Sequence, residues 1–174
     1  MTETSQPDAL AEAKPYAAAV TRLVRLHNLE VLIVFIAGLI CAGITRQRGG
    51  GVLDMSEYRW LDVLRIVAPI AALLLTGAYT QVAMTAFARK RGDAPLAPAD
   101  VLPLFTRCKH LSMHLLTLTA LFACVCLILG NRVMDLVLAV GAWVLLITTR
   151  PSTQGFETFC AVVETQRVEL STEA

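Results

Sequence analysis

The sequence predicts an all-α fold, an integral membrane four-helix bundle followed by a short C-terminal amphipathic helix. Of the 174 residues, 56% are hydrophobic and only 17% are charged, whereas a soluble domain carries about 25% charged residues. Two stretches, 66–87 and 110–129, contain no Asp, Glu, Lys or Arg. Because a bilayer core of ~30 Å needs ~20 helical residues, each stretch is long enough to span it.

Four membrane-spanning helices are expected, near residues 25–45, 64–88, 108–130 and 132–149. The apolar cores of the first and fourth helices, 31–44 and 136–147, are short, so polar neighbours such as Glu30 and Asp135 must enter the membrane region. We expect Asp135 to pair with Arg132 or to cap the fourth helix. A tight Gly-Asn turn makes the third and fourth helices antiparallel neighbours.

The chain divides into five segments. They are a flexible cytoplasmic tail (1–20), a first transmembrane hairpin (21–88), a cytoplasmic loop (89–105), a second transmembrane hairpin (106–150) and a C-terminal amphipathic segment and tail (151–174). Residues 73–85 resemble residues 146–158 at a constant offset of 73. This pattern suggests tandem hairpins related as parallel repeats, and chance similarity between apolar helices is the alternative.

The distribution of Lys and Arg predicts the orientation. Ten of these residues lie on the side of the membrane that holds the tail, the 89–105 loop and the C-terminal segment, including those at the adjoining ends of the predicted spans: Lys14, Arg22, Arg25, Arg89, Lys90, Arg91, Arg107, Lys109, Arg150 and Arg167. Four lie on the opposite side, and Arg65 lies near the membrane boundary. By the positive-inside rule both termini lie in the cytoplasm, which suits a bacterial inner membrane. The net charge of +1 provides no general attraction for nucleic acid, so we expect the lipid bilayer and other membrane chains, or further copies of this chain, as partners.

Small residues recur at helical spacing and predict packing seams between helices. They are Gly38 and Ala42 in the first span and Ala68, Ala72 and Thr76 in the second. Such a seam either joins helices of this chain or receives a helix of another chain, and the sequence leaves both possibilities open. The five cysteines include no C-x-x-C pair, which favours small apolar core residues over a disulfide scaffold or a metal site.

Polar side chains gather in the cytoplasmic halves of the predicted spans. Intramembrane polar groups usually face the bundle interior or a wet cavity, so we expect a ligand- or ion-binding pocket there. Its candidate residues are His27, Glu30, Thr80, Gln81, His110 and His114. In the alternative interpretation Glu30 pairs with Arg25 or His27 without further function, and the histidines are interfacial residues.

One stretch carries a local resemblance to a known family. His27 to Phe35, with Arg25 before it, resembles the Arg…Asn…Glu helix of the glutathione-handling MAPEG membrane proteins, through Arg25, Asn28 and Glu30. The family also consists of small four-helix chains. The resemblance implies glutathione or lipid chemistry at a trimer interface. The family's proline is Val34 here, and its motif lies on the second helix rather than the first.

No catalytic motif is present: the sequence lacks a nucleophile elbow, a phosphate loop and an H-E-x-x-H pair. We therefore assign no catalytic residue and no metal site, and the sequence does not identify a cofactor. The leading prediction is a non-catalytic multi-pass membrane protein, an accessory or assembly subunit of a membrane complex. A binding or transport module that uses the polar pocket is the second prediction, and a MAPEG-like glutathione-dependent enzyme is the third.

Overall fold

The computed structural model describes residues 6–49, 51, 58–92, 94, 96–130 and 132–172, with side chains from residue 16 onward. This part of the chain forms α-helices and contains no strand, so the all-α prediction is confirmed. The helices are α1 (Gln6–Arg48), α2 (Arg59–Arg91), α3 (Pro98–Gly130), α4 (Val133–Thr148) and α5 (Thr153–Thr172).

Three of these helices are long and apolar enough to cross a membrane. They include stretches of 33 residues each, from Tyr16 to Arg48 in α1 and over the whole of α2 and α3, with peak mean hydropathies of 2.1, 1.8 and 2.2. A helix of 33 residues extends about 50 Å at 1.5 Å per residue, well beyond the hydrocarbon core. By itself α4 has only 16 residues, and α5 continues after a bend of 77°.

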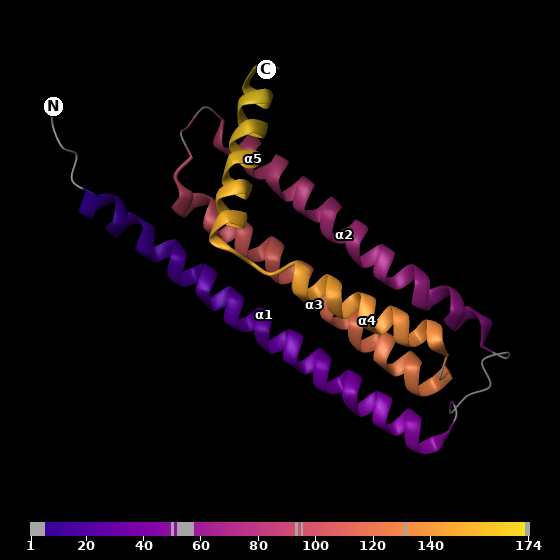
Figure 1. Ribbon diagram of the computed structural model, residues 1–174. Helices are drawn as coiled ribbons and strands as arrows, with labels where there is room; N and C mark the ends of the chain where they lie inside the picture. The colour runs from indigo at the N-terminus through magenta and orange to yellow at the C-terminus, as the bar shows by residue number, and fades with distance from the viewer. Residues whose placement is uncertain are drawn as a thin grey trace.

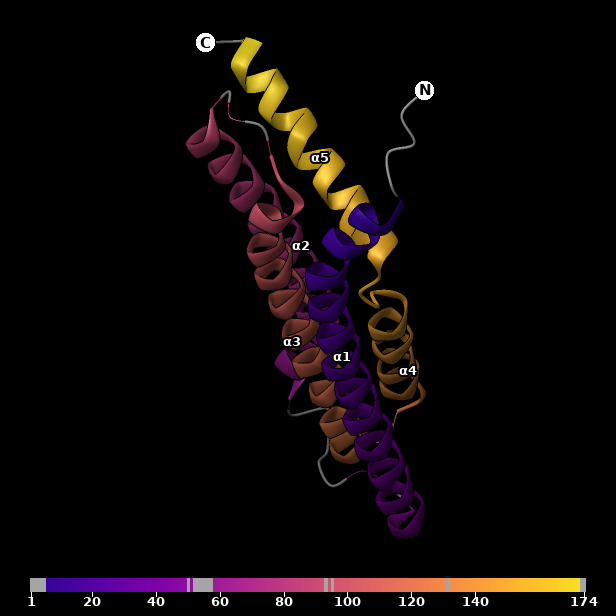
Figure 2. The same ribbon diagram turned by 90° about the vertical axis from the view of Figure 1, so that its left-hand side faces the viewer.

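The helices α1 to α4 run lengthwise side by side, and α3 contacts all four other helices (Figure 1). Among the described residues α1 and α2 make no close backbone contact, because α3 lies between them (Figure 2). Neither the four-helix bundle nor the tandem hairpins are established by this arrangement, and both stay predictions. We call the end that holds α5 the tail end, and the end that holds Gly49 and the α3–α4 turn the turn end.

The burial of side chains reflects the central position of α3. Between residues 106 and 126 it contains three Thr, two His, a Ser and three Cys, of which the Cys and Thr119 are buried and His114 is exposed. In contrast, α2 is uncharged from residue 66 to residue 87, and most of its large apolar side chains are exposed. In lipid an apolar surface needs no protein partner, so the apolar side chains of α2 can remain exposed.

Two helices begin earlier than the sequence suggests. Residues 6–20, expected in the flexible tail, are helical from Gln6 onward. In the same way α3 begins at Pro98 rather than near residue 108, because proline suits the first turn of a helix, where its missing N–H has no helical partner. An ion pair of 2.7 Å between Arg91 and Asp100 spans the short connection from α2 to α3.

In the part of the chain that the structure describes, the core consists of three apolar clusters along the bundle. The tail-end cluster joins α5 to the bundle through Phe156 and Val163, which pack with Val20, Phe105 and other residues. The middle cluster includes Val34 and Leu146, and the turn-end cluster includes Cys41 and Cys124. The prediction of a helix over 151–174 thus agrees with α5, whose apolar face lies on the bundle.

Candidate functional site

A buried carboxylate links α1 to α3 between the tail-end and middle clusters. Both oxygens of Glu30 have partners on α3: Nδ1 of His114 lies 2.8 Å from Oε1, and the hydroxyl of Thr117 donates to Oε2 at 2.6 Å. The Glu30 side chain is 8% exposed, whereas that of His114 is 57% exposed. The carboxylate is therefore held inside the bundle, and its histidine partner reaches the surface.

His27 lies one helical turn before Glu30 and is 1% exposed. Its Nδ1 atom is buried and has no hydrogen-bond partner. Glu30, Arg150 and Lys109 are all close enough to act on its charge. We call His27, Glu30, His114 and Thr117 the Glu30 cluster. It combines one carboxylate, two imidazoles and nearby basic groups at the tail end, an arrangement able to exchange protons or to bind a polar ligand.

The other predicted pocket residues are placed differently. His110 lies beside His114, with ring centroids 5.9 Å apart. The hydroxyl of Thr80 lies against the Cys108 thiol, and the side chain of Gln81 is exposed. The structure thus brings His27, Glu30 and His114 together with His110 at their edge, and it leaves Thr80 and Gln81 outside the cluster.

Thr117 is a member of the cluster that the sequence analysis missed. The sequence spacing could have identified Thr117, because it follows His114 by three residues and so lies on the same helix face. The sequence does not show which residues lie opposite Glu30, however, so it gives no reason to assign a threonine of an apolar helix to the cluster. Among the described residues no group of three or more His, Cys, Asp or Glu side chains is placed to hold a metal ion.

A second polar group lies at the turn end and joins α2 to α4. Arg65 lies 2.6 Å from Asp135, and Arg132 contacts both oxygens of Asp62 at 3.0 and 3.1 Å. Arg65 also approaches Asp62 to 3.1 Å. We call these four residues the charge clamp. Asp135 accepts a 3.3 Å hydrogen bond from the backbone N–H of Arg132, so it caps α4 as expected, but its side-chain partner is Arg65.

The predicted packing seams divide into two groups. On α2, Ala72 is buried while Ala68 and Thr76 are half-buried, and the Thr76 hydroxyl donates to the carbonyl of Ala72. This seam is used inside the chain. On α1, Gly38 is half-buried and Ala42 is exposed.

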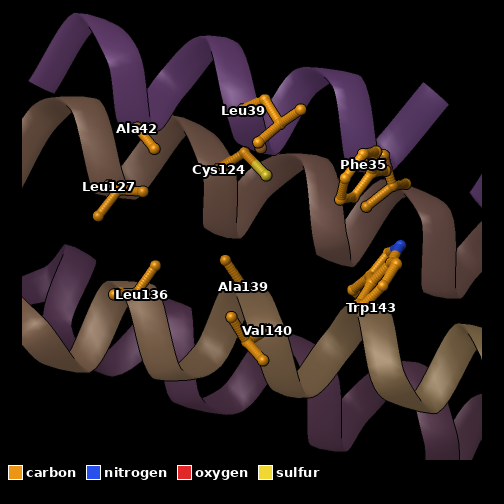
Figure 3. A pocket seen from close by; sticks show the side chains of 11 residues that line it. Phe35, Leu39, Ala42, Cys124, Leu127, Leu136, Ala139, Val140 and Trp143 are labelled. Carbon is orange, nitrogen blue, oxygen red and sulfur yellow. The ribbon is translucent and has the colours of Figure 1, made fainter. Parts of the chain in front are cut away.

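Gly38 and Ala42 line an apolar groove of about 230 Å³ between α1 and α4, with Cys124 of α3 at its floor (Figure 3). Phe35 and Trp143 stack across one end of it, with ring centroids 5.5 Å apart. The indole N–H of Trp143 is buried and has no acceptor. The groove therefore presents small side chains flanked by an aromatic pair, and no residue of the described chain fills it.

Comparisons with protein-family models, with curated proteins and with solved structures give no match to this chain. The resemblance to the MAPEG family thus rests on residues 25–35. Within that stretch the structure buries Glu30 against α3 of the same chain and leaves Arg25 and Asn28 exposed.

Proposed function

We propose that the protein is a multi-pass membrane protein that acts as a non-catalytic accessory or assembly subunit of a membrane complex. In this proposal α1 to α4 form a four-helix bundle that spans a bacterial inner membrane, with α4 drawing on its flanking polar residues to reach both boundaries. The tail end lies in the cytoplasm, because the basic residues concentrate there. The weak similarity between residues 21–88 and 106–150 is proposed to reflect tandem hairpins.

The groove between α1 and α4 carries the proposal. Small residues allow helix backbones to approach closely, and close packing is the main attraction between helices in lipid. Ala72 of α2 meets this requirement inside the chain, whereas Gly38 and Ala42 face an apolar groove that no described residue fills. The unpaired indole N–H of Trp143 at the same groove could donate to a carbonyl or hydroxyl of a partner helix. We infer that a transmembrane helix of a partner chain, or of another copy, packs there.

The test compares two substitutions on α1. Ala42→Leu fills the groove at an exposed position, and Gly43→Leu adds the same kind of side chain where a Cβ meets open space outside the groove. After purification in mild detergent, the wild type and Gly43→Leu should retain a stoichiometric partner or dimer, and Ala42→Leu should lose it. The melting temperatures of the three proteins show whether the fold is intact. A wild-type protein that purifies as a bare monomer would contradict the proposal.

The orientation has its own test. Reporter fusions at residue 172 and at residue 51 should give cytoplasmic and external signals, respectively, if the termini are cytoplasmic. The same signal from both fusions would mean an even number of spans between them, which excludes the three spans that the four-span topology places there.

A second candidate function is favoured by the Glu30 cluster. A carboxylate 8% exposed in a spanning helix is costly, and such groups usually serve ion or proton pathways. In this candidate the cluster binds a small cation or amine entering past His114 from the tail end. Melting temperatures measured with Na⁺, K⁺ and methylammonium should rise for the wild type and for Glu157→Gln, an exposed control, and should not respond in Glu30→Gln. No response of the wild type to any of the three would contradict this candidate.

A further inference from the structure

A second cavity, separate from the α1–α4 groove and from the Glu30 cluster, lies between α2 and α4. Its volume is about 330 Å³, and α3 forms its floor. Apart from Arg65 and Thr119 its lining is apolar, with Pro69 on α2 and Val137 and Gly141 on α4 among its walls. The cavity therefore begins at the charge clamp and continues as an apolar channel toward the middle of the bundle.

The polar end of this cavity contains an unused hydrogen-bond donor. Arg65 is 8% exposed, and its terminal nitrogens are occupied by Asp62 and Asp135. Its Nε atom is buried and has no hydrogen-bond partner. A buried donor normally has an acceptor, from protein, water or ligand. Arg65 lines the cavity, so a ligand bound there could supply the acceptor that Nε lacks.

The backbone at the same position supports this interpretation. Pro69 has no N–H, so it cannot donate the helical hydrogen bond to the carbonyl of Arg65, four residues earlier. Arg65 therefore has an unpaired donor in its side chain and a backbone carbonyl that lacks its helical partner. Both Arg65 and Pro69 line the cavity. Thr119 adds little, since its hydroxyl proton is donated to the carbonyl of Leu115.

Charge indicates what kind of acceptor fits. The clamp contains two arginines and two aspartates, so its formal charge is already balanced. A ligand carboxylate beside Arg65 would also lie close to the carboxylate of Asp135 and would be repelled by it. A neutral carbonyl oxygen can accept from Nε without that penalty.

The shape of the cavity indicates the rest of the ligand. Its lining on α4 extends from Val137 to Leu145, about 12 Å at 1.5 Å per residue. If the helices span a membrane as proposed, the clamp lies near one hydrocarbon boundary, which is the depth of lipid ester groups, and the apolar part points to the bilayer centre. This step rests on the membrane-spanning part of the proposed function and not on the partner helix.

We propose that the α2–α4 cavity binds one acyl chain of an ester lipid, whose ester carbonyl accepts a hydrogen bond from Nε of Arg65. The chain lies between Pro69 and Gly141 and over the floor formed by α3. The bound lipid completes the interface between α2 and α4 below the charge clamp.

The first experiment fills the cavity. Gly141→Leu places a side chain in open space on the cavity wall, and Gly77→Leu does the same on α2 outside the cavity. The proteins are purified from vesicles of phosphatidylethanolamine and phosphatidylglycerol and examined by native mass spectrometry. The wild type and Gly77→Leu should retain one phospholipid per chain, and retention in Gly141→Leu should fall by about tenfold. Equal retention in Gly141→Leu and Gly77→Leu, or none in the wild type, would overturn the proposal.

The second experiment tests the chemistry of the head group. Monolaurin, which is an ester, should raise the melting temperature of delipidated wild-type protein, whereas laurate, the matching carboxylate, should not. Gly141→Leu should respond to neither compound. Stronger stabilisation by laurate would overturn the neutral-carbonyl assignment and would point to a fatty-acid site.

The two proposals fail in different ways. A protein that does not enter the membrane fraction at all contradicts the proposed function and this inference together. If the protein is inserted and keeps its partner, but the Gly141→Leu variant binds lipid as well as the wild type does, only the lipid site is contradicted.

Discussion

The guanidinium of Arg65 lies 2.6 Å from the carboxylate of Asp135, and both side chains are buried. Three residues earlier on each helix, Asp62 faces Arg132 with the charges reversed. The start of α2 thus carries Asp-x-x-Arg, and the start of α4 carries Arg-x-x-Asp. Because α2 and α4 run parallel, the opposite charges lie at the same level. Each charge is neutralised within the clamp, which reduces the cost of placing it at the edge of an apolar bundle.

Removing one buried partner should destabilise the protein strongly. Asp135→Asn leaves the Arg65 charge buried with less compensation, and we expect a loss of about 3–5 kcal/mol in the free energy of unfolding. The matched change at the more exposed pair, Arg132→Gln, should cost about 1 kcal/mol or less. Chemical unfolding in detergent measures both values.

Exchanging the charges tests whether the ion pair is the source of this effect. The double variant Arg65→Asp with Asp135→Arg should recover part of the stability lost by either single variant, since the opposite charges face each other again. Full additivity of the two losses would show that the pair does not couple.

The hydrogen bond between Thr117 and Glu30 should also be measurable. Thr117→Val removes the hydroxyl that donates to Oε2, and we expect a loss of about 1–3 kcal/mol because the acceptor is charged and buried. Thr106→Val removes a half-buried hydroxyl that donates only to the backbone of its own helix and should cost less. In a Glu30→Gln background the effect of Thr117→Val should shrink, and an unchanged effect would contradict the contact.

The docking of α5 depends on one aromatic side chain. Phe156 is fully buried and packs against Phe105, with ring centroids 5.2 Å apart. Phe156→Ala should cost about 3–5 kcal/mol in the stability of this docking and release α5. Trypsin should then cleave after Arg167 much faster, because this side chain reaches the carbonyl of Gly92 only in the docked position. Val168→Ala, at an exposed site, should leave the cleavage rate unchanged.

Cys160 on α5 offers a test by pH. Burial raises the pKa of its thiol, and the negative charge of Glu157 raises it further. Because the thiolate is the reactive form, its alkylation by iodoacetamide should accelerate as the pH rises toward that raised pKa. Glu157→Gln lowers the pKa, so it should speed alkylation at a given pH. Glu169→Gln should have no effect, and a slower reaction of Glu157→Gln would contradict the assignment.

Several features could be predicted from the residues in order along the chain. Uncharged runs of about 20 residues predict spanning helices, and the Gly-rich and Pro-rich stretches between them predict breaks. The polar cluster was partly predictable too, since Glu30 is an acid at the edge of an apolar run and needs partners. The starts of α1 and α3 were not, because an extended helix at a membrane boundary shows no change in hydrophobicity where it begins.

The partners of each polar side chain depended on how the helices are arranged. The sequence by itself determined that the chain is helical and apolar enough for a membrane, because helical periodicity and hydropathy are local properties. Tertiary structure alone decided that α3 separates α1 from α2, that Thr117 rather than Gln81 meets Glu30, and that Asp135 pairs with Arg65 as well as capping α4. These are contacts between residues 70 or more positions apart, and only the packing of whole helices brings them together.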